Sequence, residues 1–84
     1  MTPSFMVEHF EVTGVLDMAP RGFTYLLTMD NGQSWSLNLG KYWRPRRFLG
    51  LRITAIGPRC GERIIEVLRL YIHDADGDSG HWVL

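Results

Sequence analysis

The sequence predicts a single all-β domain, and three features of its 84 residues lead to that prediction. Glycine and proline recur at short intervals, so that only short segments lie between successive turns. Several of these segments alternate apolar and polar residues with a period of two, as strands with one buried face do. Hydrophobic residues make up 45% of the chain and charged residues 21%, which is typical of a globular domain.

Three strands are expected in the first half of the chain, over residues 10–16, 23–29 and 34–39. Gly14 interrupts the apolar face of the first strand, which indicates a bulge or a tight bend of a barrel strand. The segment Asp30-Asn31-Gly32-Gln33 predicts a hairpin between the second and third strands, because Asn and Gly tolerate the positive φ of a tight turn.

The third strand has the clearest alternation, with three large apolar residues on one face and three small polar residues on the other. The residues expected to point into the barrel are Trp35, Leu37 and Leu39. The residues expected to face solvent are Ser34, Ser36 and Asn38. A slip of one residue would exchange the two faces, so the hairpin is expected to fix the register.

A short helical connection and two further strands are expected in the second half. Residues 40–50 break the alternation, and Pro45 and Gly50 are suited to open and end a single helical turn. A fourth strand is expected over residues 51–56. Residues 62–72 fit one face of a helix but are rich in β-branched side chains, so a strand is favoured over a helix there.

Three meandering strands, a helical connection and two more strands follow one another in the order of an OB-fold. The predicted fold is therefore all-β, a five-stranded, OB-like, partly open barrel with a short helical connection between the third and fourth strands. We expect one domain over residues 1–84, with the barrel at about residues 8–72 and an acidic, glycine-rich tail at 73–84.

A family resemblance rests on four segments, which correspond to the bend, the hairpin, the connection with the fourth strand, and the last strand. They are Thr13–Leu16, Asp30–Leu37, Arg46–Gly57 and Ile65–Leu70. Through them the chain resembles a small bacterial family of uncharacterised OB-fold-like domains over about residues 10–72. The resemblance implies the fold alone, and no activity or catalytic residue can be carried over from it.

The net charge is zero, but the charges are segregated along the chain. Residues 1–40 carry a charge of −3, residues 41–69 a charge of +6, and residues 70–84 a charge of −3. The basic segment begins with a run at residues 41–48 that interleaves Lys and Arg with Tyr, Trp and Phe. Cations can contact phosphates and aromatic rings can stack on unpaired bases, so this run is the most function-like stretch of the chain.

The leading hypothesis is a non-enzymatic binding module that contacts an anionic partner, such as nucleic acid, through this basic aromatic connection. The candidate binding residues are Lys41, Tyr42, Trp43, Arg44, Arg46, Arg47 and Arg52. In the structural alternative, the aromatic residues of the connection cap the open end of the barrel and the arginines are solvated. The second and third strands, a common OB platform, present no aromatic or basic residue outward, which weighs against single-strand binding there.

A second hypothesis is a protein-interaction or structural domain, for example a homodimer through the last strand. Its basis is that both faces of this strand carry large apolar residues, whereas a small barrel has only one interior. One face would hold Leu68, Leu70 and Ile72, and the other Ile65, Val67 and Tyr71.

No catalytic motif and no cofactor or metal motif is recognised, so neither an enzyme nor a bound cofactor is expected. Asp74, Asp76 and Asp78 alternate like the start of an EF-hand loop, but no predicted helices flank them. Cys60 is the single cysteine, which cannot close an intramolecular disulfide, and it is expected in a turn. No secretory signal or membrane-spanning run is expected, which favours a cytoplasmic protein without a membrane partner.

Overall fold

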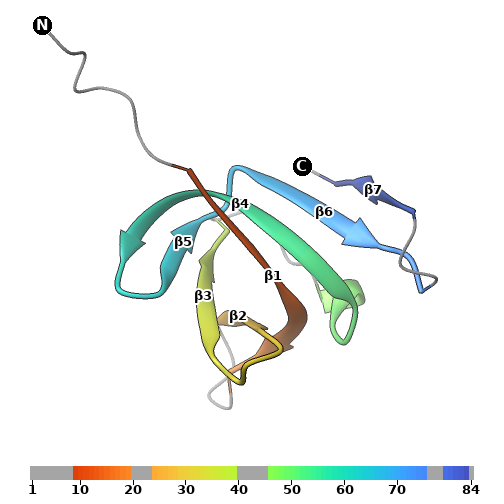
Figure 1. Cartoon of the computed structure of the whole chain (residues 1–84), viewed down its shortest axis with the longest axis horizontal. Helices are drawn as coiled ribbons and strands as arrows, with labels where there is room; N and C mark the ends of the chain where they lie inside the picture. The colour runs from red at the N-terminus through yellow and green to blue at the C-terminus, as the bar shows by residue number, and fades with distance from the viewer. Residues whose placement is uncertain (1–8, 20–23, 40–45, 76–78, 84) are drawn as a thin grey trace, which may run out of the picture.

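The computed structural model describes residues 9–19, 24–39, 46–75 and 79–83, and its strands form a barrel with a sheet extension (Figure 1). The strands are β1 (His9–Met18), β2 (Tyr25–Thr28), β3 (Ser34–Asn38), β4 (Arg52–Gly61), β5 (Ile64–Glu66), β6 (Arg69–His73) and β7 (Gly80–Trp82). A 3-10 turn, η1 (Arg46–Phe48), precedes β4, and no α-helix occurs in the described ranges. The all-β prediction is confirmed.

The barrel is closed by the strands β1, β2, β3, β5 and β4, of which the last pairs again with the first. All of these pairings are antiparallel except that of β3 with β5, which is parallel. The prediction of a partly open barrel is therefore wrong. Closure is possible because β1 is ten residues long: it pairs with β4 from His9 to Val15 and with β2 from Val15 to Met18.

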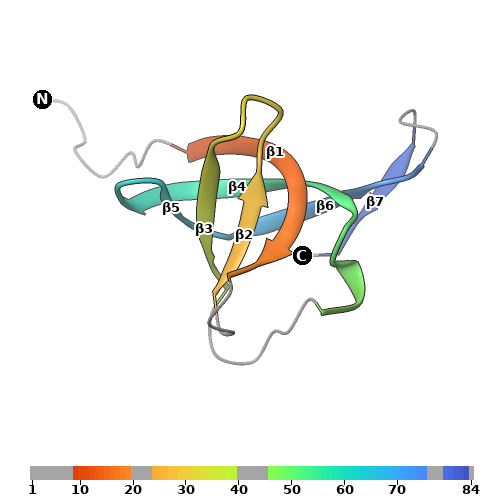
Figure 2. The ribbon, with the colours of Figure 1, turned by 90° about the horizontal axis from the view of Figure 1, so that it is seen from below.

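Strand β1 curves around the barrel to serve both neighbours (Figure 2), and Gly14 lies just before the change of partner. A Cβ atom at Gly14 would lie 2.5 Å from the carbonyl oxygen of Thr28 on β2. Only glycine allows the two backbones to approach this closely. The glycine that indicated a bend in the sequence is thus placed at the curved part of the strand.

The connection before β4 was predicted to be helical, but its described part contains a single 3-10 turn of three residues. Two features keep it short. Gly50 adopts a positive φ of 85°, which ends the turn, and its N–H donates to the carbonyl oxygen of Leu16 at 2.9 Å. The N–H of Leu16 in turn donates to the carbonyl of Leu51 at 2.9 Å. Pairing with β1 therefore begins directly after the 3-10 turn.

The predicted hairpin joins β2 to β3, although its turn differs from the expected one. The N–H of Met29 donates to the carbonyl of Gln33 at 2.8 Å, and that of Gly32 donates to the carbonyl of Met29 at 2.9 Å. In this loop only Gly32 has a positive φ, 87°, as in a three-residue hairpin loop with glycine in the left-handed position. Asn31 contributes through its side chain, whose Oδ1 accepts from the N–H of Gln33 at 2.9 Å.

The fourth strand extends to Gly61, well beyond residues 51–56, so Cys60 lies on β4 and not in a turn. Glu62 and Arg63 form the turn that follows, with Arg63 at a positive φ of 55°. Gly57 and Pro58, which lie just beyond the predicted strand, are part of β4 and pair with β1.

The segment at residues 62–72 forms strands and no helix, in agreement with the favoured prediction, but it contains two strands and not one. The chain changes neighbours between them, because the N–H of Val67 donates to Asn38 of β3 at 3.0 Å and that of Leu68 to Ile56 of β4 at 2.9 Å. The backbone of this break packs directly on Gly57, where a Cβ atom would collide with the carbonyl oxygen of Glu66.

The break shifts the inward-facing alternation by one residue. Ile65 and Val67 are buried before it, and Leu70 and Ile72 are buried after it. Apolar residues at odd-numbered positions before the break and at even-numbered positions after it are therefore buried in the same barrel core. This shift explains why Ile65, Val67, Leu70 and Ile72, which belong to both predicted faces, are all buried, whereas Leu68 is exposed.

Residues 73–84, described from composition as an acidic tail, contribute β7 to the sheet. This strand pairs antiparallel with β6 from Tyr71 to His73. It lies outside the closed barrel, at the end of the strand order (Figure 1).

The barrel interior is filled by aliphatic side chains from every strand of the closed circuit and from β6. The largest fully buried residues are Leu16, Leu27, Ile53, Ile65 and Leu70. On β3 the predicted inward face is confirmed for Leu37, which is buried. Trp35 and Leu39 are only half-buried but pack against this core, and the Trp35 ring centroid lies 6.0 Å from that of Phe10.

Replacement of Trp35 by alanine is expected to lower the free energy of unfolding by about 2–3 kcal/mol, less than for a fully buried aromatic residue. The loss comes from the packing of the indole ring against Phe10 and the core. Ser36→Ala, on the opposite face of the same strand, should change the stability by less than about 0.5 kcal/mol. Urea denaturation of both variants measures the difference, and equal losses would contradict the assigned faces.

Candidate functional site

The structure describes three of the predicted binding residues, Arg46, Arg47 and Arg52. The other four, Lys41, Tyr42, Trp43 and Arg44, lie outside the described residues.

Arg46 and Arg47 are adjacent and exposed on η1, which the Leu16 pairing fixes against β1. The guanidinium of Arg47 lies 4.9 Å from the ring centroid of Phe48, and this ring packs against the barrel core. Within the described ranges, neither arginine has a carboxylate at ion-pair distance. Phe48 thus packs against the core, while the two arginines beside it are exposed to solvent.

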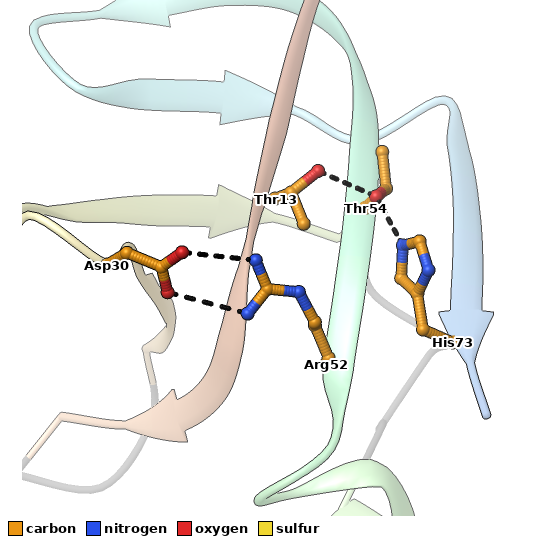
Figure 3. Close-up of polar contacts among 5 residues, drawn as sticks. All are labelled: Thr13, Asp30, Arg52, Thr54 and His73. Atoms are coloured by element: carbon orange, nitrogen blue, oxygen red, sulfur yellow. Dashed lines mark hydrogen bonds and ion pairs between the residues drawn. The ribbon is translucent and has the colours of Figure 1, made fainter. Parts of the chain in front are cut away.

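Arg52 differs from these two because a carboxylate compensates its charge. Its guanidinium donates to both carboxylate oxygens of Asp30, at 3.4 and 3.3 Å (Figure 3). Both side chains are exposed, so the ion pair contributes at most about 1 kcal/mol to stability. Arg52 is therefore a weaker candidate for binding an anion than Arg46 and Arg47.

A second candidate site, which the sequence analysis did not identify, lies on the outer face of the sheet formed by β1, β4, β6 and β7. The strand registers place Thr13, Thr54, Tyr71 and Trp82 in one row across these four strands. An open pocket of about 340 Å³ is lined by Glu11, Thr54, Ile56, Tyr71, His73 and Trp82. We call it the outer-face pocket.

A chain of hydrogen bonds crosses the sheet at this pocket. The hydroxyl oxygens of Thr13 and Thr54 are 2.7 Å apart, and the Thr54 hydroxyl is 2.7 Å from Nε2 of His73 (Figure 3). Thr54 is buried, so these two bonds satisfy its hydroxyl group. Each hydroxyl both donates and accepts, so the chain can run in either direction, and His73 can carry its proton on either ring nitrogen.

Aromatic rings also line the outer-face pocket. Tyr71 stands nearly perpendicular to His73 and to Trp82, with centroid separations of 5.0 Å in both pairs. This edge-to-face geometry is favourable for aromatic pairs. The guanidinium of Arg69 lies 4.1 Å from the Trp82 ring, a cation–π contact.

The outer-face pocket was missed because its residues come from four strands spread over the chain, with no common motif. The available signal was the outward parity of each strand: Glu11 and Thr13 alternate with buried residues on β1, and Tyr71 and His73 do so on β6. That these outward residues lie side by side follows only from the order of the strands in the sheet and from the position of β7.

Cys60 and the described acidic residues do not form a further candidate site. Cys60 is exposed and unpaired. Over the described part of the chain, no group of three or more His, Cys, Asp or Glu side chains is placed to hold a metal ion. The same residues contain no helix with the length and hydropathy needed to cross a membrane. Asp76 and Asp78 lie outside the described residues.

Comparison with known protein families gives a match. A family described as "Protein of unknown function (DUF5818)" matches residues 13–71, more than half of the chain. This range lies within residues 10–72, over which the sequence resembled an uncharacterised domain family. No curated protein and no solved structure matches the chain.

Proposed function

The chain belongs to the DUF5818 family of proteins of unknown function, and from this premise we propose that it is a non-enzymatic, OB-like binding module for an anionic partner. Nucleic acid is the first candidate for that partner. The observation that carries the proposal is the pair of exposed arginines on η1 without carboxylate partners in the described ranges.

The strand circuit supports the OB-like assignment. Three antiparallel meander strands are followed by a connection to β4, and the barrel closes through β3–β5 and β4–β1 pairing. This is a five-stranded Greek-key arrangement, and the OB-fold recurrently binds oligonucleotides with its strands and loops. The likeness concerns the fold, so the binding proposal depends on the charged residues and not on the fold.

Electrostatics favours η1 as the contact. Arg46 and Arg47 occupy successive positions of one turn, and the sequence adds Lys41 and Arg44 to the same connection. Phe48 anchors the turn to the core, so the two guanidinium groups are attached to a fixed support. Arginine forms bidentate hydrogen bonds with phosphate groups, which suits this residue type to a phosphodiester backbone.

The non-enzymatic assignment rests on the hydroxyl–imidazole contact of Thr54 and His73. A catalytic nucleophile needs an accessible oxygen, whereas Thr54 is 8% exposed and also hydrogen-bonded to Thr13. Together with the Thr13 bond, this contact instead links three strands, β1, β4 and β6.

We place the protein in the cytoplasm, since its single cysteine suits a reducing compartment.

Binding of a fluorescent single-stranded oligonucleotide, followed by anisotropy over a range of salt concentrations, tests the proposal. The logarithm of the affinity should fall linearly with the logarithm of the salt concentration, by about 0.7 for each phosphate contact. Arg46→Gln/Arg47→Gln should therefore lower the slope by about 1.4 and weaken binding at low salt.

Arg59→Gln is the matched control, because Arg59 lies at the other end of β4, up to about 23 Å along the strand from Arg52. It should leave the slope nearly unchanged. An absence of binding at low salt, or an equal effect of the control, would contradict the proposed contact.

A further inference from the structure

The lining of the outer-face pocket combines aromatic side chains, an isoleucine side chain and a carboxylate, and the anionic-partner proposal does not use this combination. We propose that it binds a purine base whose edge carries two adjacent N–H donors, as guanine does. None of the residues that line it belongs to η1, so the proposal is independent of binding at Arg46 and Arg47.

Stacking is the first part of the argument. Trp82 is 47% exposed although it lines the pocket, and the perpendicular ring of Tyr71 supports it at 5.0 Å. A large aromatic ring held by a neighbour but left open to solvent is suited to stacking against a planar ligand. Ile56 adds an apolar side chain to the same pocket.

Charge selects among planar ligands. The pocket-lining carboxylate side chain is that of Glu11, which is exposed on β1. A carboxylate is an acceptor only, so it favours a ligand edge rich in N–H donors. The N1–H and the amino group of guanine provide two such donors side by side, matching two carboxylate oxygens.

A cationic ligand is disfavoured, although aromatic rings with a carboxylate could otherwise bind one. The guanidinium of Arg69 already lies 4.1 Å from the Trp82 ring and would repel a second cation at that wall. A neutral heteroaromatic ring experiences no such repulsion. The ligand is thus expected to be planar, neutral and rich in N–H donors.

His73 provides a further polar group at the pocket. Its Nε2 atom is engaged with Thr54, whereas its Nδ1 atom lies on the side of the ring away from Thr54 (Figure 3). Because the Thr13–Thr54–His73 chain can run in either direction, Nδ1 can donate or accept. The volume of about 340 Å³ lies in the range of small-molecule sites.

Titration of the full chain with guanosine, inosine and adenosine, followed by NMR, tests the proposal. The reporter is the indole N–H signal of Trp82, assigned by its loss in Trp82→Phe. Guanosine should shift this signal with a Kd of about 10–1,000 µM. Inosine lacks the amino group and should bind more weakly, and adenosine should bind most weakly.

The carboxylate is tested by Glu11→Gln, with Glu66→Gln on β5 as the control for an exposed glutamate outside the pocket. Glu11→Gln should weaken guanosine binding roughly tenfold, and Glu66→Gln should leave it unchanged. The proposal is overturned if guanosine does not shift the Trp82 signal at about 1 mM. It is also overturned if the three nucleosides bind equally or if the two glutamate variants behave alike.

Discussion

Gly57→Ala is expected to lower the free energy of unfolding by at least about 4 kcal/mol, a loss seen only when a substitution disrupts packing or backbone geometry. The added methyl group would collide with the carbonyl oxygen of Glu66 and would also lie 3.2 Å from the amide nitrogen of Leu68. Both contacts are with backbone atoms, which cannot rotate away as a side chain can. Since small domains are stable by about 5–15 kcal/mol, such a loss removes a large part of the stability of the domain.

Gly61→Ala on the same strand is the matched control. Its methyl group would meet the end of the Ile64 side chain at 2.9 Å, and that side chain is partly exposed and can move. The loss should stay below about 1 kcal/mol. Circular dichroism and urea denaturation of both variants measure the difference, and a stable Gly57→Ala domain would disprove the close approach at the break.

Leu27→Ala is expected to lower the free energy of unfolding by about 3–5 kcal/mol. Leu27 is completely buried on β2, between Leu16 of β1 and Trp35 of β3 in the strand register. Truncation would leave a cavity in the interior of a closed barrel, where the surrounding backbone can collapse little.

The same substitution at Leu68, which is 47% exposed, controls for the change of residue type. Leu68→Ala should cost no more than about 1 kcal/mol, because this exposed residue already contacts water in the native state. Similar denaturation midpoints for the two variants would show that the Leu27 side chain is not in the core.

The first half of the fold was predictable from local signals. Gly14 marked the bend because only glycine allows the close approach to the Thr28 backbone there. The Asn31-Gly32 turn marked the hairpin because it needs a positive φ, which Gly32 adopts. The turn type was not predictable, since the same residues fit a loop in which only Gly32 has a positive φ.

The second half depends on tertiary contacts that local patterns do not contain. Glycine followed by proline is typical of the end of a strand. Strand β4 nevertheless continues through Gly57 and Pro58, because β1 pairs with them and the backbone of Glu66 packs against Gly57. In the same way, the change of parity between Val67 and Leu70 reads as two apolar faces until the change of strand partners is known.

Of the two candidate sites, the basic connection was visible in the sequence because its residues are contiguous. The outer-face pocket was not, because Glu11 and Trp82 come from opposite ends of the chain and meet only through the order of four strands. The alternation of buried and outward residues along β6 could identify Tyr71 and His73 as outward-facing. It could not identify which residues lie beside them on the neighbouring strands.

The dual pairing of β1 also affects how quickly the chain can fold. Barrel closure requires β1 to find β4, in a register that brings His9 opposite Pro58, and these partners are distant in the sequence. The entropy of closing such a large loop must be lost before the pairing contributes any stabilising contacts. Folding is therefore expected on a scale of roughly milliseconds to seconds, slow for a chain of this length. The β2–β3 hairpin, whose contacts are local, can form long before the ends of the barrel meet.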